Sequence, residues 1–161
     1  MDPEAKKEGR YERIYEQLKG LLTKTSDPVA RMATIASLLK HKMDYFFWCG
    51  FYRLDGKTLV VGHYQGPLAC QELEGGGVFW EAVEDNATTV VPNVHEFPGH
   101  IACDSRSNSE IAVPVRNEEG KILAVLDVDS KSFDAFDDID AVWLEDIADL
   151  VYKDGTPPFP W

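Results

Sequence analysis

Apolar residues recur every three or four positions in the first quarter of the chain, which is the spacing of one face of an α-helix. The first such stripe predicts a helix from about Pro3 to Leu22. The run Thr25-Ser26-Asp27-Pro28 then forms a helix start with proline in the first turn, and a second stripe predicts a helix that continues to about Met43. We expect both helices to pack against a sheet.

From Tyr45 onward, aromatic and β-branched residues replace this pattern, and they predict strands. The segment YFFWCGFYRL predicts a buried strand, Asp55-Gly56 a tight hairpin turn and TLVVGHYQG the returning strand. A short helix is expected at VFWEAVED, and strands at TTVVP, SEIAVPV and KILAVLDVD. Apolar positions from Phe136 to about Tyr152 fall on one helical face and predict a closing helix.

The order of these elements predicts an α+β fold. Strands joined mainly by hairpins indicate a central antiparallel sheet of about six strands, with the N- and C-terminal helices packed on one face. A chain of 161 residues suits a single domain. Within it we expect a helical N-terminal segment over 1–43, a sheet core with its closing helix over 44–152, and an irregular proline-rich tail over 153–161.

The charge of the chain narrows the classes of partner. Sixteen Lys and Arg against 28 Asp and Glu give a formal net charge of −12, which argues against binding nucleic acid or an anionic membrane surface. No apolar run reaches the length of a transmembrane helix, and the first residues lack the apolar segment of a signal peptide. We therefore expect a cytoplasmic protein, in which the three cysteines are thiols rather than structural crosslinks.

The stretch VPNVHEFPGHIACDSRSNSE, from Val91 to Glu110, is rich in reactive side chains and has no clear helix or strand pattern. A long polar loop of this kind inside a small domain is more often functional than a spacer. Its Cys103 is the first candidate for a catalytic residue. Cys70 also lies beside a Pro/Gly turn, so the two thiols could form a nucleophile and a resolving partner that closes a disulfide. Cys49, inside an aromatic strand, is expected to be inert packing.

Two other interpretations of this region carry less weight. His95, His100, Cys103 and Asp104 are residue types that bind metals, but their spacing is not that of a structural zinc site and a second Cys-x2-Cys arm is missing. We expect no metal, and we expect His100 to order the loop or to favour the Cys103 thiolate. The glycine run at 75–77 could hold an anion before a helix, but it lacks the Lys-Ser/Thr of a nucleotide loop, so tight backbone packing is favoured.

Three acidic residues could form the substrate-binding part of a site. Asp127 and Asp129 are two apart on a predicted strand and point to one face, and Glu110 opens the neighbouring strand. Converging acids would bind an ammonium group, and their repulsion would keep one of them protonated as a proton donor to a leaving oxygen. The alternative is that they solvate strand ends. Trp48 could provide an apolar wall for a methyl group or belong to the core, and Tyr52 on the same strand is a further candidate substrate-binding residue.

The chain resembles the free methionine-(R)-sulfoxide reductases, which are built on a GAF domain. The matching pieces run in the family's order from Phe47 to about Asp140: WCGFYRL, GHYQGPLACQ, VVPNVHEFPGHIACDSRSNSEIAVPV, LAVLDVDS and FDDID. A generic GAF sensor would not be expected to carry PGHIACD together with SEI-x-VP. The resemblance implies one GAF-like domain over residues 1–161.

The resemblance also implies a mechanism. Cys103 matches the nucleophile, which becomes a sulfenic acid as methionine leaves, and Cys70 matches the cysteine that resolves it as a disulfide. Thioredoxin would restore both thiols as an external reductant, with no bound cofactor. Trp48 matches a tryptophan that contacts the substrate methyl group. The three acids described above match those that hold the free amino acid and help to protonate its oxygen, which restricts the enzyme to free methionine sulfoxide.

The sequence departs from the family pattern at two places. Phe79 replaces a third cysteine that members often carry, and Asn93 replaces an aspartate in the loop. The main alternative function is a non-catalytic GAF module that binds a small molecule without turnover. The amphipathic N-terminal helix is compatible with a homodimer, and equally with a helix that covers the sheet.

Overall fold

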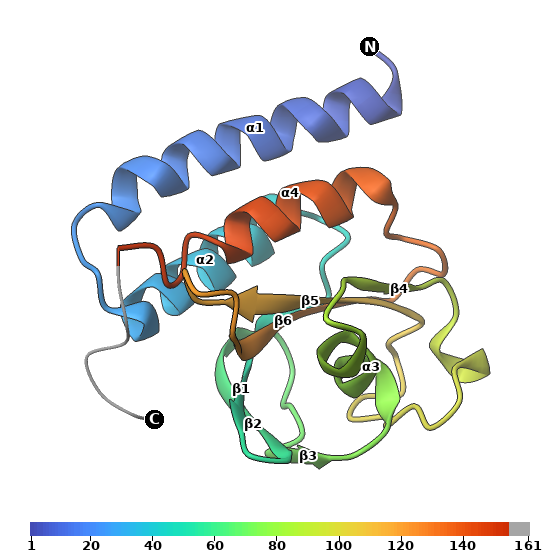
Figure 1. Cartoon of the computed structure of the whole chain (residues 1–161). Coiled ribbons are helices and arrows are strands. Elements are labelled where there is room, and N and C mark those ends of the chain that lie inside the picture. Colours follow the sequence, from blue (N-terminus) through green and yellow to red (C-terminus); the bar gives the residue numbers. More distant parts are fainter. Residues whose placement is uncertain (155–161) are drawn as a thin grey trace.

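The computed structural model of the chain describes residues 1–154, so the tail expected over 153–161 lies outside the described residues from residue 155 onward. Figure 1 shows helices above and below one sheet. The helices are α1 (Pro3–Leu22), α2 (Pro28–Lys42), α3 (Gly77–Asp85) and α4 (Asp138–Ala148), with a 3-10 turn η1 (Val94–Glu96). The strands are β1 (Trp48–Asp55), β2 (Thr58–Gln65), β3 (Glu72–Glu74), β4 (Thr89–Val91), β5 (Ser109–Arg116) and β6 (Ile122–Ser130).

The sheet is antiparallel throughout and has the strand order β3-β2-β1-β6-β5-β4. The predicted α+β class is therefore confirmed. The β1–β2 hairpin closes through two residues, Gly56 and Lys57, and Gly56 adopts a φ of 61° that glycine tolerates without strain. Strand β3 was not predicted, because its three residues are too short for a periodic pattern and are held by pairing with β2.

The sheet separates two apolar clusters, since alternate residues of each strand point to opposite faces. On the helix side, Cys49, Phe51 and Leu126 pack with α2 and α4. On the other side, Trp48, Tyr52 and other residues pack with α3 and the loop before β5. This second cluster forms the support of the candidate site.

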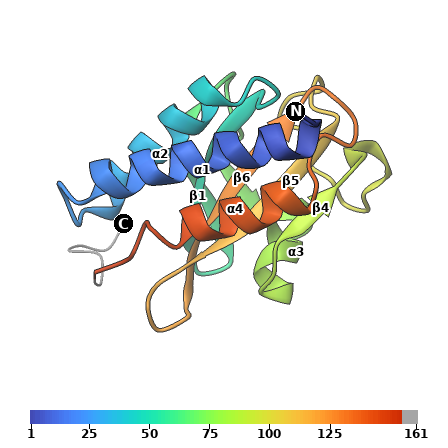
Figure 2. The ribbon, with the colours of Figure 1, turned by 90° about the horizontal axis from the view of Figure 1, so that it is seen from above.

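The N- and C-terminal helices lie on one face of the sheet, as expected, but in two layers. Helices α2 and α4 contact the strands, whereas α1 packs mainly on α2 and α4 (Figure 2). The prediction that α1 packs against the sheet itself is corrected in this respect. Its apolar stripe is buried within the chain by this packing (Tyr11, Ile14, Leu18 and Leu22). A homodimer through α1 stays a prediction.

The closing helix is shorter than predicted and ends at Ala148 rather than near Tyr152. The buried guanidinium of Arg31 explains why the chain leaves the helix. It donates hydrogen bonds of 2.8 Å to the carbonyl oxygens of Leu150 and Lys153 and one of 3.1 Å to that of Leu22. These bonds hold the segment after α4 in turns against the end of α1. Within residues 1–154, no helix is long and apolar enough to cross a membrane.

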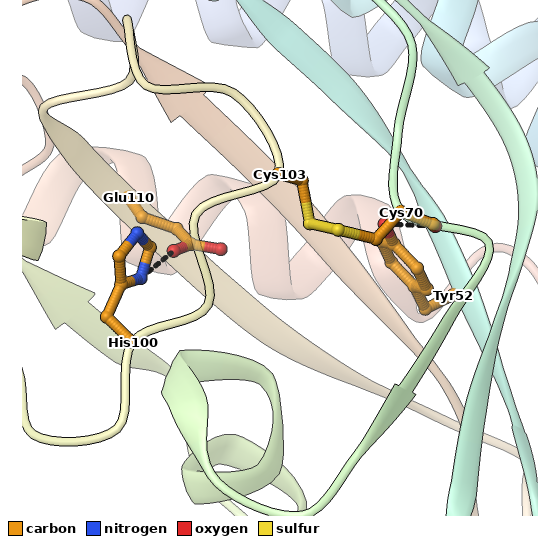
Figure 3. Close-up of a disulfide and its surroundings, with 5 residues drawn as sticks. All are labelled: Tyr52, Cys70, His100, Cys103 and Glu110. Atoms are coloured by element: carbon orange, nitrogen blue, oxygen red, sulfur yellow. Dashed lines mark hydrogen bonds and ion pairs between the residues drawn. A yellow bond between two sulfur atoms is a disulfide. The ribbon is translucent and has the colours of Figure 1, made fainter.

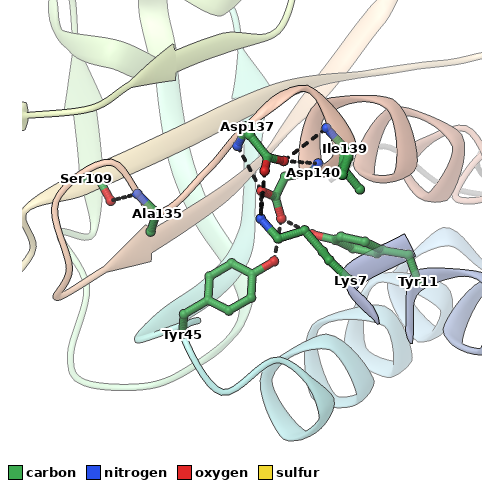
Figure 4. A network of polar contacts seen from close by, with 8 residues as sticks. All are labelled: Lys7, Tyr11, Tyr45, Ser109, Ala135, Asp137, Ile139 and Asp140. Carbon is green, nitrogen blue, oxygen red and sulfur yellow. Dashed lines mark hydrogen bonds and ion pairs between the residues drawn. The ribbon is translucent and has the colours of Figure 1, made fainter. Parts of the chain in front are cut away.

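A buried carboxylate connects the helical layers. Asp140 is fully buried and accepts hydrogen bonds from the hydroxyls of Tyr11 and Tyr45, at 2.6 and 2.5 Å, and from the Lys7 ammonium at 2.8 Å (Figure 4). It also accepts from the backbone N–H of Asp137 in a capping box at the start of α4. One side chain thus joins α1, the segment before β1 and α4.

We expect Asp140→Asn to destabilise the fold by about 2–4 kcal/mol, because it removes the buried charge that the Tyr11 and Tyr45 hydroxyls and the Lys7 ammonium share and leaves Lys7 with Asp137 alone. The measurement is urea unfolding followed by circular dichroism. Glu16→Gln, which breaks an exposed pair with Lys19, is the control and should leave the midpoint unchanged. A loss below about 1 kcal/mol for Asp140→Asn would show that the network does not hold the helices together.

Candidate active site

The register of the three central strands places the predicted substrate-binding residues in one row. Asp129 of β6 lies opposite Trp48 of β1 on one side and opposite Glu110 of β5 on the other. Directly paired residues share a face of the sheet, so the three side chains project to the side away from α2 and α4. Asp127 occupies the next row on the same face, between Gly50 and Ala112. The sequence-based expectation that the acids converge is thus confirmed.

A glycine allows the tryptophan to lie against the sheet. A Cβ atom on Gly50 would lie 2.7 Å from Cη2 of Trp48 and 2.3 Å from Cβ of Tyr64, so only glycine fits under these side chains. The Trp48 ring stacks on Tyr64 with their centroids 5.2 Å apart. This packing fixes the ring as one wall of the pocket.

The three carboxyl groups lie within reach of one another and away from water. One ligand oxygen from each lies within 4.8 Å of the others, and Glu110 and Asp127 are each only 1% exposed. Among the described residues, neither oxygen of Glu110 has a hydrogen-bond partner. Burial raises the pKa of Glu110, Asp127 and Asp129, and mutual repulsion raises the pKa of both aspartates further. The cluster therefore titrates as a unit and holds protons to higher pH than ordinary carboxyl groups do, and a cationic donor would satisfy its free oxygens.

The two candidate catalytic cysteines meet above this cluster. A disulfide joins Cys70 and Cys103, whose Cα atoms are 5.3 Å apart (Figure 3), a separation that a disulfide spans readily. The sulfurs come from two segments without regular structure, one after β2 and one before β5. Cys49 lies on the opposite face of the sheet, and burial raises its pKa, so it is a poor nucleophile.

The pocket is narrow in this disulfide-linked form. Its lining combines the acids and cysteines with apolar side chains that the sequence did not single out (Phe47, Leu68 and Ile101). The free space is about 30 Å³, room for one or two water molecules. Sequence patterns could not identify these apolar residues, because they belong to three separate segments and none repeats with a period.

His100 lies beside the acid cluster. Its Nδ1 atom lies 4.0 Å from Oε1 of Glu110, and its side chain is only 15% exposed (Figure 3). Burial, with a smaller contribution from His95, lowers the pKa of His100. A neutral imidazole at pH 7 cannot act as the cationic neighbour of Cys103 that the sequence suggested. The other expected role, ordering the loop, agrees with this position.

The other polar residues of the loop form separate side-chain pairs. Asp104 pairs with Arg106 at 2.7 Å, and hydrogen bonds from Arg106 lower the pKa of Asp104 to about 2. His95 Nε2 lies 2.7 Å from Oδ1 of Asn108. With Cys103 in a disulfide, these side chains do not form a common set of metal ligands. Among residues 1–154, only the three carboxyl groups cluster as potential metal ligands.

The backbone conformation at residues 75–77 explains the run of three glycines. Gly75, Gly76 and Gly77 all have φ values between 55° and 81°, which favour glycine. The carbonyl oxygen of Gly99 lies close above Gly77, at 3.5 Å from the place of a Cβ atom. The loop that carries His100 and Cys103 therefore packs on the start of α3, which supports the packing interpretation of this run.

Comparisons with known proteins agree with this geometry. The GAF domain family matches residues 29–151. GAF domain-containing protein A of Dictyostelium discoideum is 43% identical over 90% of this chain and 92% of its own length. Free methionine-R-sulfoxide reductase of Saccharomyces cerevisiae is 37% identical over 88% of this chain and 86% of its own. The free methionine-R-sulfoxide reductase of Neisseria meningitidis, solved in complex with its substrate, superimposes with a TM-score of 0.84 at 38% identity and covers 89% and 86% of the two chains.

The buried acids predict an unusual dependence of stability on pH. A carboxyl group whose pKa is raised by folding binds its proton more tightly in the folded state, so stability falls as pH rises above about 4. Asp127→Asn removes one such group. We expect it to stabilise the fold at pH 8 by about 1 kcal/mol or more, the free energy of one pKa unit, with a gain that shrinks toward pH 4.

Urea unfolding at several pH values measures this effect, with the exposed Glu84→Gln as control. A variant less stable than the wild type at pH 8 would mean that Asp127 is ionised and paired in the folded protein.

Proposed function

This chain belongs to the GAF-domain family and, within it, to the free methionine-(R)-sulfoxide reductases, and we propose that it reduces free methionine (R)-sulfoxide through Cys103 and Cys70. It is accordingly an oxidoreductase that acts on the sulfur of methionine sulfoxide. The observation that carries the proposal is the placement of two joined cysteines beside three clustered carboxyl groups, two of them buried, and a fixed tryptophan. Such a pocket offers a nucleophile, a proton donor and a site for an ammonium group.

In the first half-reaction the Cys103 sulfur attacks the sulfoxide sulfur. The S–O bond to methionine breaks, the oxygen is transferred to Cys103, and the products are a sulfenic acid and methionine, so the cysteine is oxidised and the sulfoxide reduced. A carboxyl group that keeps its proton at neutral pH can donate it to the sulfoxide oxygen. We assign this role to Glu110 and Asp129, the two acids that lie in the row with Trp48.

In the second half-reaction the Cys70 thiol attacks the sulfenic sulfur of Cys103. The S–O bond breaks, a disulfide forms and the oxygen leaves as water. The structure corresponds to the product of this step. A dithiol reductant of the thioredoxin type then restores both thiols by disulfide exchange, which fits a protein that works in the cytoplasm. Because the oxidised pocket has room for only a few atoms, reduction precedes the binding of the next substrate.

The acids also set the choice of substrate. The α-ammonium group of a free amino acid supplies the cationic donor that the buried oxygens of Glu110 and Asp127 require. A peptide-bound methionine sulfoxide has no such group next to the reacting residue. The Trp48 ring supplies the apolar wall for the methyl group on sulfur.

The different roles of the two cysteines predict different amounts of methionine released per protein molecule. Cys103→Ser should release no methionine above background, whereas Cys70→Ser should release one equivalent per protein and stop as a sulfenic acid. Cys49→Ala, on the far face of the sheet, is the matched control and should turn over like the wild type. Methionine release and intact mass with a sulfenic-acid trap measure these outcomes. Sustained thioredoxin-driven turnover by Cys70→Ser would reject Cys70 as the resolving residue.

The proton-donor role of Asp129 predicts a loss of turnover. We expect Asp129→Asn to lower kcat/KM for the free substrate about 100-fold, because an amide cannot donate a proton to the leaving oxygen and general acid catalysis contributes a factor of this order. The N-acetylated substrate, which has no ammonium group, should be a poor substrate for both proteins. Steady-state kinetics with Glu84→Gln as control tests this, and unchanged kcat/KM would remove Asp129 from the site.

A further inference from the structure

The segment that carries Cys70 is irregular but fixed at both ends. It leaves β2 at Gly66, where a Cβ atom would lie 2.8 Å from the carbonyl oxygen of Phe47, so glycine is required for the chain to turn there. It is fixed again at Gln71, whose carbonyl accepts a hydrogen bond of 2.9 Å from the backbone N–H of Val61. Between these points the position of Cys70 depends on side-chain contacts.

One such contact comes from the middle of the sheet. The hydroxyl of Tyr52 donates a hydrogen bond of 3.0 Å to the carbonyl oxygen of Cys70 (Figure 3). Among the described residues, this is the one side-chain hydrogen bond to the segment over 66–71. Tyr52 lies in β1, paired with β2 on one side and β6 on the other, and is only 2% exposed. The donor is therefore attached to a central strand that is paired on both sides.

Two aromatic neighbours hold the Tyr52 ring in place. Phe79 meets it edge-on, with ring centroids 5.0 Å apart, and Trp48 lies 5.9 Å away on the same strand. Phe79 is the residue that replaces a cysteine often present in the family. Burial and the nearby acids raise the pKa of Tyr52, so its hydroxyl remains a donor throughout the working range of pH. Two aromatic side chains thus fix the donor.

We infer that Tyr52 is a positioning residue for the resolving step: its hydroxyl holds the Cys70 backbone so that the Cys70 thiol can reach the sulfenic sulfur of Cys103. The inference rests on the proposed function and deepens it. Two sulfurs on separate irregular segments form a disulfide only when their Cα atoms approach to about 5–6 Å, and the Tyr52 bond restricts one of the two segments. The first half-reaction does not involve Cys70 and should not depend on this bond.

The two half-reactions can be separated in a single turnover. Reduced protein is mixed with free methionine (R)-sulfoxide without a reductant, and quenched samples are analysed for methionine, trapped sulfenic acid and the loss of two hydrogens that marks the disulfide. For Tyr52→Phe we expect methionine release at the wild-type rate and disulfide formation slowed about fivefold, the factor that corresponds to one hydrogen bond. Sulfenic acid should accumulate in proportion. Tyr152→Phe is the control: it removes a buried hydroxyl that has no hydrogen-bond partner among the described residues, on the helix side of the sheet, and should behave as the wild type.

Three results would overturn or separate the claims. If Tyr52→Phe forms the disulfide at the wild-type rate, the hydroxyl does not position Cys70. If methionine release slows while disulfide formation from the sulfenic acid does not, Tyr52 acts on the substrate instead. If the wild-type protein releases no methionine, the proposed function fails, and this result is distinct from either of the others.

Discussion

The pairing of β6 with β1 on one side and with β5 on the other controls the site, because it brings three carboxyl groups together where two of them are buried. Glu110, Asp129 and Trp48 lie in one row across the sheet, and Asp127 follows in the next. Bringing the acids together costs free energy through desolvation and repulsion. The central strands, with an apolar cluster on each face, hold the groups in place despite this cost. Chemically, the result is a set of acids with raised pKa values, in which oxygens of Glu110 and Asp127 have no hydrogen-bond partner among the described residues.

The residues that recognise the substrate and the residues that carry out the sulfur chemistry lie in different kinds of structure. The acids and Trp48 stand on paired strands, whereas both sulfurs belong to irregular segments. This division suits a cycle in which Cys103 must meet first a substrate and then Cys70, because irregular segments can move while paired strands cannot. The strands still reach the sulfurs indirectly. The Tyr52 hydroxyl holds the Cys70 backbone, and His100, on the same loop as Cys103, lies 4.0 Å from Glu110 of β5.

Features set by local spacing were predictable, and features set by distant contacts were not. The alternation of side chains along a strand correctly predicted that Asp127 and Asp129 share a face. The helical spacing of apolar residues correctly predicted the bounds of α1. Three features were not predicted, because distant contacts determine them. Strand β3 depends on its pairing with β2, and the outer position of α1 depends on α2 and α4. The early end of α4 depends on the hydrogen bonds of Arg31. The hydrogen bond from Tyr52 to Cys70 spans 18 residues and has no sequence signal. The proximity of His100 to Glu110 likewise required the fold.

The central claim is tested most directly by methionine release from the separate (R)- and (S)-sulfoxides of free methionine, with thioredoxin, its reductase and NADPH present. Intact mass is read in parallel on protein treated with each isomer alone. The account predicts turnover of the (R) isomer and a loss of two hydrogens located at Cys70 and Cys103. Folded, fully reduced protein that releases no methionine from either isomer would contradict it, and binding of the sulfoxide without oxidation of Cys103 would identify a GAF module that binds its ligand without turnover.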